Sequence, residues 1–375
     1  MNISEETPRL VLDQDRLEQN AARFLKRAED TGVLLRPHLK TAKSLQVADV
    51  ATGGRKSGIT VSTLKEAEYF AANGYSDILY AVGVTPNKFG MVQQIQITTG
   101  QIITLITDDL SVAHAAVAFS DSADVPLEFL IEIDCGEHRG GLDAHSEDLL
   151  QIASVFDRAK NVTLRGVMTH AGHSYTTDDP SEIAEIAEAE RQAAVTAAKR
   201  LRAVGCPCDV VSAGSTPTFL YGRSFEGLTE MRCGVYLFYD LAQQSRGICG
   251  LDEIAISVLA TVIGHNRPNG LVTIDAGALA LSKDTSANTF NPDAGFGYVC
   301  NPDTCQRLGE LSVRTVHQEH GTIPVPNDSW FESLPVGSQV RILPNHACPT
   351  AAAFDSYLVM QNRSQVAEWA RVNGW

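Results

Sequence analysis

Eight short apolar runs, most of them separated by stretches rich in alanine, glutamate and leucine, are the feature that most constrains the fold of this chain. Short buried strands that alternate with helices predict parallel β/α units. Eight such units over roughly 220 residues fit a closed (β/α)8 barrel of TIM type. The predicted strands are Leu34–Arg36, Gly58–Val61, Asp77–Val82, Gln101–Ile106, Leu127–Ile133, Leu164–Met168, Asp209–Ser212 and Thr229–Arg232.

An open, doubly wound sheet is the structural alternative to the barrel. No Gly-x-Gly-x-x-Gly motif follows the first strand, which weakens that alternative. After about Asp240 the pattern changes to β-rich runs with turn-rich segments between them, which predicts an antiparallel β domain. We therefore expect an α/β barrel over 13–245 and a mainly antiparallel β domain formed by 1–12 and 246–375. The β-leaning runs of the second domain are Glu253–Ile263, Leu271–Ile274, Leu311–Val316, Gln339–Leu343 and Tyr357–Met360.

Composition argues against several classes of partner. The 375 residues carry a formal net charge of −15 and a pI near 5.1, which argues against nucleic acid or an anionic membrane as partner. The opening Met1–Glu6 has neither a basic nor an apolar segment, and no run approaches the length needed to span a bilayer. Eight cysteines without a CxxC pair are sparse for this length. We expect a cytoplasmic protein with reduced thiols.

Lys40 follows the first predicted strand. Pro37 cannot continue a strand interior, so Lys40 should stand at the carboxyl edge, where the active sites of alternating α/β folds collect. A lysine there forms a Schiff base when desolvation or positive neighbours, here Arg36, His38 or Lys43, lower its pKa. A solvated basic loop is the alternative that this stretch alone leaves open.

Small residues follow the seventh and eighth predicted strands. The loop of Gly214, Ser215 and Thr216 offers backbone N–H groups and hydroxyls that can cradle a phosphate. Gly234 and Tyr236 form a second glycine turn with an aromatic hydroxyl. Phosphate sites of TIM barrels are frequently built from the loops after these two strands, so position and chemistry agree. A plain βα turn is the alternative for the first loop.

Polar groups also follow the fifth and sixth strands. Arg139 stands among glycines after the fifth strand, and a surface turn is the alternative reading there. His170, His173 and Tyr175 follow the sixth strand. Three polar aromatic groups at one strand end favour a site over a structural role.

The β domain contains a candidate metal pair. His346 and Cys348 follow a strand-like run, and residues two apart on extended backbone point to the same side. Two ligands are too few for a closed structural site, so water and substrate would complete the sphere of a catalytic metal. The alternative is a buried cysteine beside a turn histidine. Gln318 and His320 form a second polar cluster that is a candidate to line the same pocket and contact substrate.

Five stretches spread over nearly the whole chain carry a resemblance to a known family. They are Arg36–Thr41, Ser57–Glu68, Gly214–Thr218, Gln318–Gly321 and Pro344–Cys348. With these stretches the chain resembles the fold-type III pyridoxal-phosphate enzymes of the D-serine dehydratase and D-threonine aldolase family. The resemblance implies a barrel of the alanine racemase N-terminal type, a β domain with a metal site, and a homodimer.

The resemblance also implies a role for each candidate residue. Lys40 would carry pyridoxal 5'-phosphate as a Schiff base, and His346 and Cys348 would bind a divalent metal beside the β-hydroxyl of the substrate. The thiolate ligand favours zinc, with manganese or magnesium as the harder alternatives. The other implied cofactor contacts are Gly214, Ser215, Thr216, Gly234 and Tyr236 at the phosphate, Arg139 at the phenolic oxygen, His170 on the ring and Tyr175 near the pyridine nitrogen.

The implied reaction is dehydration of a β-hydroxy D-amino acid, such as D-threo-3-hydroxyaspartate or a D-serine-like compound, to a 2-keto acid and ammonia. Retro-aldol cleavage to glycine and an aldehyde is the alternative, but aldolases of the family tend to have Asp where Cys348 stands. A racemase leaves the metal pair without a role, and a cofactor-carrier protein leaves the β domain unexplained. Many relatives have His where this chain has Ala42, so no proton-transfer role of that histidine is carried over.

Overall fold

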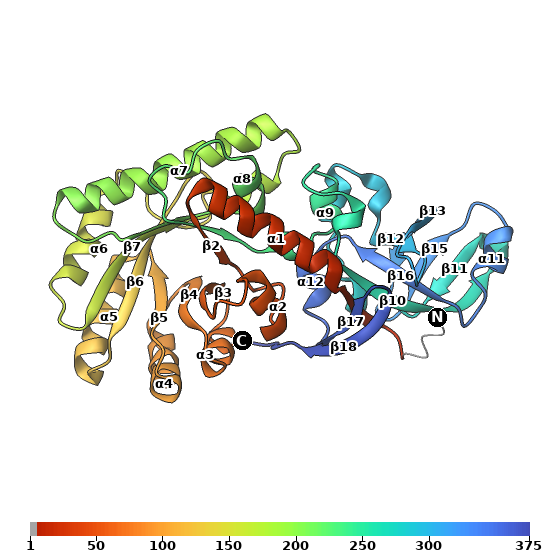
Figure 1. The fold of residues 1–375 in the computed structure, drawn as a ribbon, viewed down its shortest axis with the longest axis horizontal. Helices are drawn as coiled ribbons and strands as arrows, with labels where there is room; N and C mark the ends of the chain where they lie inside the picture. The colour runs from red at the N-terminus through yellow and green to blue at the C-terminus, as the bar shows by residue number, and fades with distance from the viewer. Residues whose placement is uncertain (1–5) are drawn as a thin grey trace. The chain divides into compact units, whose positions relative to one another are not determined.

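A computed structural model describes residues 6–375, which divide into two units (Figure 1). One unit comprises Ala22–Gly234 and Val372–Trp375, and the other comprises the chain up to Ala21 together with Val235–Arg371. Of the opening Met1–Glu6, which has neither a basic nor an apolar segment, residues 1–5 lie outside the described part. No helix of the described part is both long and apolar enough to cross a membrane.

Eight parallel strands form the centre of the first unit, and each overlaps one of the eight predicted runs. Strands that follow one another in the chain are also neighbours in the sheet. Because they are parallel, each connection crosses back over the sheet from the end of one strand to the start of the next. The strands are β2 (Leu34–Pro37), β3 (Ser57–Val61), β4 (Ser76–Gly83), β5 (Ile103–Thr107), β6 (Leu127–Ile133), β7 (Val162–Thr169), β8 (Val210–Ala213) and β9 (Glu230–Cys233).

The sheet closes into a barrel at its first strand. β2 pairs with β9, in register from Leu34 opposite Glu230. On its other side β2 meets β3 through a parallel bridge between His38 and Thr60, and the Leu39 N–H donates to the Thr60 carbonyl over 2.8 Å. All eight carboxyl ends therefore lie at one rim, and the predicted (β/α)8 barrel is confirmed.

Helices cover the outside of this barrel (Figure 1). Their start signals are local: Thr63, for example, caps α3 by accepting from the Glu66 N–H over 3.1 Å. The Glu66 carboxylate accepts from the Ser62 N–H rather than from the cap's own N–H, so the motif is not a strict capping box. The helices are α2 (Leu45–Ala51), α3 (Leu64–Ala72), α4 (Phe89–Thr99), α5 (Leu110–Ala123), α6 (Glu147–Asp157), α7 (Pro180–Ala203) and α8 (Thr216–Tyr221); α1 (Gln14–Thr31) precedes β2.

The second unit is built on a ten-stranded sheet. All its strand pairs are antiparallel except β1 with β17, which confirms the mainly antiparallel β domain. Val11, Leu259 and Leu358 from three neighbouring strands pack together in its core. The strands are β1 (Arg9–Asp13), β10 (Ile256–Asn266), β11 (Leu271–Ile274), β12 (Gly297–Cys300), β13 (Arg307–Ser312), β14 (Thr315–Val316), β15 (Gly321–Pro324), β16 (Gln339–Pro344), β17 (Ser356–Gln361) and β18 (Ser364–Ala370).

The prediction of a single strand over Leu311–Val316 is wrong. Leu311–Val316 is not a single strand, because the chain changes partner within it. β13 pairs with β12, whereas β14 pairs with β15, and the Arg314 N–H donates to the Thr322 carbonyl over 2.9 Å. The apolar pattern continues through the change of partner, so the sequence gives no sign of it.

Candidate active site

Lys40 lies in the turn that follows β2, at the rim where the strands end. Its neighbours Leu39 and Thr41 are buried, whereas Lys40 is exposed. Two of the three cations expected to act on Lys40 are neutralised instead. Arg36 is buried and bonds Glu230 and Asp77, each over 2.8 Å, and Lys43 lies 3.3 Å from the Glu66 carboxylate.

His170 is fixed against the loop that follows β8. Its Nδ1 atom lies 2.9 Å from the Gly214 carbonyl oxygen. Because a carbonyl only accepts, Nδ1 carries the hydrogen and Nε2 keeps its lone pair. Burial lowers the pKa of the His170 imidazole to about 3, and the hydrogen bond to Gly214 offsets this only in part. The charges of Arg232, Lys40 and Arg139 contribute to this lowered pKa, so the imidazole is neutral and faces a positively charged site.

The loop after β8 packs closely on β9 and contains a buried hydroxyl without a protein partner among residues 6–375. Gly214 has φ of +127°, and a Cβ atom there would lie 2.6 Å from the Arg232 backbone nitrogen. Ser215 caps α8, while the Thr216 N–H donates to the Tyr175 hydroxyl over 3.3 Å. The Thr216 hydroxyl is buried without a hydrogen-bond partner in the described part of the chain. A buried hydroxyl of this kind fits an anionic ligand that it would donate to.

Gly234 repeats this pattern after β9. A Cβ atom there would lie 2.8 Å from the His38 carbonyl oxygen, so only glycine fits at this point of the rim. Tyr236 belongs to the 3-10 turn Val235–Leu237 of the second unit, where it is buried. Within the barrel unit the structure thus brings His170 to Gly214 and Tyr175 to Thr216.

Arg139, like Lys40, is an exposed member of the predicted cofactor residues. Its side chain is 61% exposed, and Nη1 lies 3.4 Å from the Glu137 carboxylate. Glu137 in turn accepts from the Gly172 N–H over 3.3 Å, which links the loops after β6 and β7. Burial lowers the pKa of His38, and the charges of Lys40 and Arg139 lower it further. Arg139 follows β6 and Lys40 follows β2, so both lie at the rim where the parallel strands end.

The candidate metal pair lies at the start of α12 (Ala347–Ala351) in the second unit. His346 Nδ1 lies 2.7 Å from Asp284 Oδ2, and His346 also bonds the Cys348 side chain. Asp240 is buried next to this pair and accepts from the Ala347 N–H over 2.8 Å. Burial opposes a charge on His346, but the bonds to Asp284 and Cys348 raise its pKa to about 11.

This donor set fits a metal with an incomplete protein shell. An imidazole held by a carboxylate through one ring nitrogen, with a thiol beside it, is the usual surrounding of a metal-binding histidine. In residues 6–375 no three His, Cys, Asp or Glu side chains are arranged to hold an ion by themselves. A metal at His346 and Cys348 would need ligands from solvent or substrate, as the sequence predicts.

Two family models match consecutive parts of the chain. The alanine racemase N-terminal domain matches residues 12–242, and the putative serine dehydratase domain matches residues 255–360. The chain belongs to the pyridoxal-phosphate-dependent lyase family of D-serine dehydratases and D-threonine aldolases. The family predicted from the sequence motifs is thereby confirmed.

Full-length relatives within this lyase family act on D-amino acids. The chain is 42% identical to the D-threo-3-hydroxyaspartate dehydratase of Delftia sp. strain HT23, over 99% of this chain and 98% of the relative. It is 32% identical to the D-serine dehydratase of Dictyostelium discoideum, over 95% and 93%. The solved structure of the Delftia dehydratase has a TM-score of 0.95 at 41% identity and covers 99% of each chain. A cysteine-to-alanine mutant of D-threo-3-hydroxyaspartate dehydratase has been solved in a metal-free form.

Gln318 and His320 stand in the exposed turn between β14 and β15. The turn is closed by a bond from the His317 N–H to the His320 carbonyl over 2.8 Å. It packs closely on Gly277, where a Cβ atom would lie 2.4 Å from the His320 nitrogen. A substrate contact by Gln318 or His320 stays a prediction.

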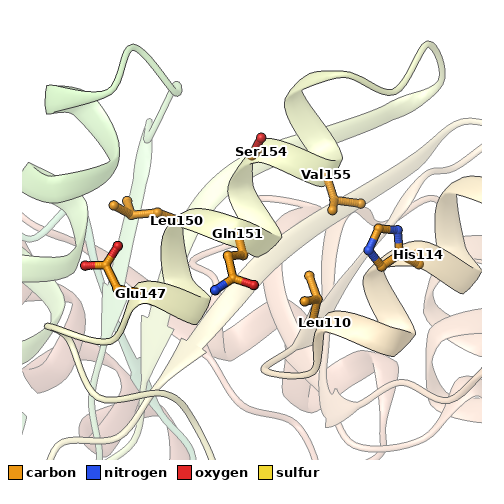
Figure 2. Close-up of a pocket in the computed structure, with 7 residues that line it drawn as sticks. All are labelled: Leu110, His114, Glu147, Leu150, Gln151, Ser154 and Val155. Carbon is orange, nitrogen blue, oxygen red and sulfur yellow. The ribbon is translucent and has the colours of Figure 1, made fainter.

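An open surface pocket of about 330 Å³ lies between α5 and α6 on the outside of the barrel (Figure 2). Figure 2 shows that two outer helices line it, and none of the predicted site residues does. We assign it no part in the family's chemistry. Its lining residues are Leu110, His114, Glu147, Leu150, Gln151, Ser154 and Val155.

Sequence reasoning missed three buried or half-buried carboxylates, at Glu190, Asp240 and Asp284. A signal exists for Glu190 alone. Glu190 occupies a position on the buried, otherwise apolar stripe of α7, between Ala187 and Ala194. Asp284 is 62 residues from His346, and nothing in the local sequence relates the two.

Proposed function

We propose that this lyase dehydrates a β-hydroxy D-amino acid, D-threo-3-hydroxyaspartate or a D-serine-like compound, to a 2-keto acid and ammonia. The observation that carries the proposal is the pair His346 and Cys348, with Asp284 behind the histidine. A reaction that requires no metal would give His346 and Cys348 no chemical role. The full-length identity of 42% to a D-threo-3-hydroxyaspartate dehydratase supports the same choice of reaction.

The barrel, expected over 13–245, would hold pyridoxal 5'-phosphate. Its fit rests on the buried, unpartnered hydroxyl of Thr216, and on Gly214 and Gly234, which let the two loops pack closely on the barrel backbone at the rim. Gly214, Ser215, Thr216, Gly234 and Tyr236 would hold the phosphate, and Lys40 would hold the cofactor through its ε-amine. When bound, the pyridinium ring supplies an electron sink for the bond broken at the α-carbon.

Neighbouring residues would orient the cofactor and handle the proton. Nζ of Lys40 would remove the α-proton, since an exposed ε-amine at the strand end can reach a bound substrate. His170 would pack on the ring as a neutral imidazole, because its Nδ1–H is already donated to Gly214. We assign Arg139 to the phenolic oxygen and Tyr175 to the neighbourhood of the pyridine nitrogen.

The β domain, expected over 1–12 and 246–375, would hold the metal. A divalent ion supplies Lewis acidity that neutralises charge on a departing β-hydroxyl. His346 and Cys348 would bind it, and thiolate softness favours zinc over manganese or magnesium. The relative's solved mutants support this choice: one changes a histidine, and the metal-free one changes a cysteine two positions later, the spacing of His346 and Cys348. A cytoplasmic homodimer, with Gln318 and His320 near the substrate, completes the proposal.

A substrate panel tests the proposal. The purified protein is incubated separately with D-threo-3-hydroxyaspartate, D-serine and D-threonine, and the products are identified. Ammonia with a 2-keto acid supports dehydration and ranks the substrates. Glycine with an aldehyde would instead support the aldolase reaction and overturn the proposal.

A further inference from the structure

Glu190 is a carboxylate on a helix face that otherwise buries small apolar groups. It lies in α7 at the spacing of Ile183, Ala187 and Ala194, which are all buried. Its relative exposure is 1%, so water does not satisfy its oxygens. A buried carboxylate is costly unless the protein supplies its hydrogen bonds. The groups that donate hydrogen bonds to Glu190 therefore indicate its role.

One oxygen of Glu190 binds two different loops of the barrel rim. Oε1 accepts from the Ala171 N–H and from the Gly214 N–H, each over 2.9 Å. Ala171 follows His170 after β7, and Gly214 precedes Ser215 after β8. A single atom thus spans the two loops that contain the predicted ring-packing residue and the predicted phosphate residues.

The backbone of Gly214 is fixed on several sides. Its N–H is held by Glu190 and its carbonyl by His170 Nδ1, both over 2.9 Å. On its remaining side the Arg232 backbone leaves no room for a side chain. Without the Glu190 acceptor, two buried N–H groups would lose their partner at once, and the spacing of the two loops would no longer be fixed.

We propose that Glu190 is a positioning residue of the cofactor site, whose Oε1 atom holds His170 and the Gly214–Thr216 loop in place before the cofactor binds. This inference rests on the proposed function, in which these loops hold pyridoxal phosphate. In this role Glu190 acts through the two loops and not by a contact of its own with cofactor or substrate. Its effect is preorganisation, which lowers the cost of ordering the loops on binding.

Titration of the cofactor-free protein with pyridoxal phosphate, followed by its near-visible absorbance and circular dichroism, tests the inference. Glu190→Ala should weaken cofactor affinity about tenfold or more and reduce the induced dichroism, because two buried N–H donors lose their acceptor. Glu190→Gln keeps an oxygen acceptor at the same place and should bind within about threefold of wild type. The rescue by glutamine separates positioning from a general need for negative charge.

The control is Glu188→Ala, which removes a more exposed carboxylate of the same helix that pairs with Arg191. It should leave affinity and dichroism unchanged. Thermal unfolding of each cofactor-free variant confirms that it is folded, and Glu190→Asp replaces Glu190→Ala if the latter does not fold. Wild-type binding by Glu190→Ala, or no rescue by Glu190→Gln, would overturn the inference. If the wild type itself binds no pyridoxal phosphate, the proposed function fails instead.

Discussion

The Nδ1 atom of His346 lies 2.7 Å from the Oδ2 atom of Asp284. A carboxylate in this place fixes the orientation of the imidazole and leaves Nε2 for a metal. Asp284→Asn should therefore weaken metal affinity about 10- to 100-fold, measured by competition with a chromogenic chelator. The control is Asp293→Asn, which removes an exposed carboxylate that pairs with Arg314. Equal affinities for all three proteins would contradict this role of Asp284.

Lys40→Ala tests the assignment of the cofactor lysine. An alanine has no amine, so the near-visible absorbance of protein-bound pyridoxal phosphate should disappear and activity should be lost. Lys43→Ala is the matched control, because that lysine lies three positions on and pairs with Glu66. An absorbance band that persists unchanged in Lys40→Ala would show that another residue holds the cofactor.

Gly214→Ala tests the close packing of the loop after β8. The new Cβ would meet the Arg232 backbone at 2.6 Å, and φ of +127° is strained for alanine. We expect the free energy of unfolding to fall by about 2 kcal/mol or more and the affinity for pyridoxal phosphate to weaken. Gly205→Ala also has a positive φ, but nothing lies within 4 Å of its Cβ. The control should lose stability without losing cofactor affinity, and equal effects on affinity would contradict the packing argument.

The His170 imidazole makes stability depend on pH. Unfolded histidine takes up a proton below about 6.5, whereas in the folded protein burial lowers the pKa of His170 to about 3. The unfolded state therefore binds more protons between these values, and stability falls as pH decreases through this range. Between pH 7.5 and 5 this group should cost about 2 kcal/mol of unfolding free energy.

Urea unfolding of the cofactor-free protein at both pH values measures that cost. Glutamine does not titrate in this range. Between the two pH values, the unfolding free energy of His170→Gln should therefore fall by about 2 kcal/mol less than that of wild type. His145→Gln, at an exposed position, should behave as wild type. The same pH dependence in His170→Gln would show that other groups cause it.

Much of the fold was predictable because it depends on local signals. Each barrel strand is a short apolar run bounded by helix-forming sequence, and the rim residues Lys40, His170 and Gly214 directly follow such runs. A residue that ends a parallel strand must lie at the rim, whatever the details of packing. The elements therefore determine where these candidates lie.

Contacts between distant parts of the chain were not predictable in this way. Asp284 reaches His346 across 62 residues, and β13 and β14 divide a continuous apolar run between two partner strands. Glu190 was missed for a different reason. Its place on the apolar stripe of α7 is visible in the sequence, but its two acceptor bonds depend on the loops after β7 and β8.

Metal dependence of ammonia release tests the central claim most directly. Ammonia and 2-keto acid are measured from D-threo-3-hydroxyaspartate with the wild type, with the wild type after chelation, and with His346→Ala. We expect chelation and His346→Ala each to abolish release while the absorbance of bound pyridoxal phosphate is unchanged, and added zinc to restore only the chelated wild type. Full activity of His346→Ala, or glycine in place of ammonia from the wild type, would contradict it.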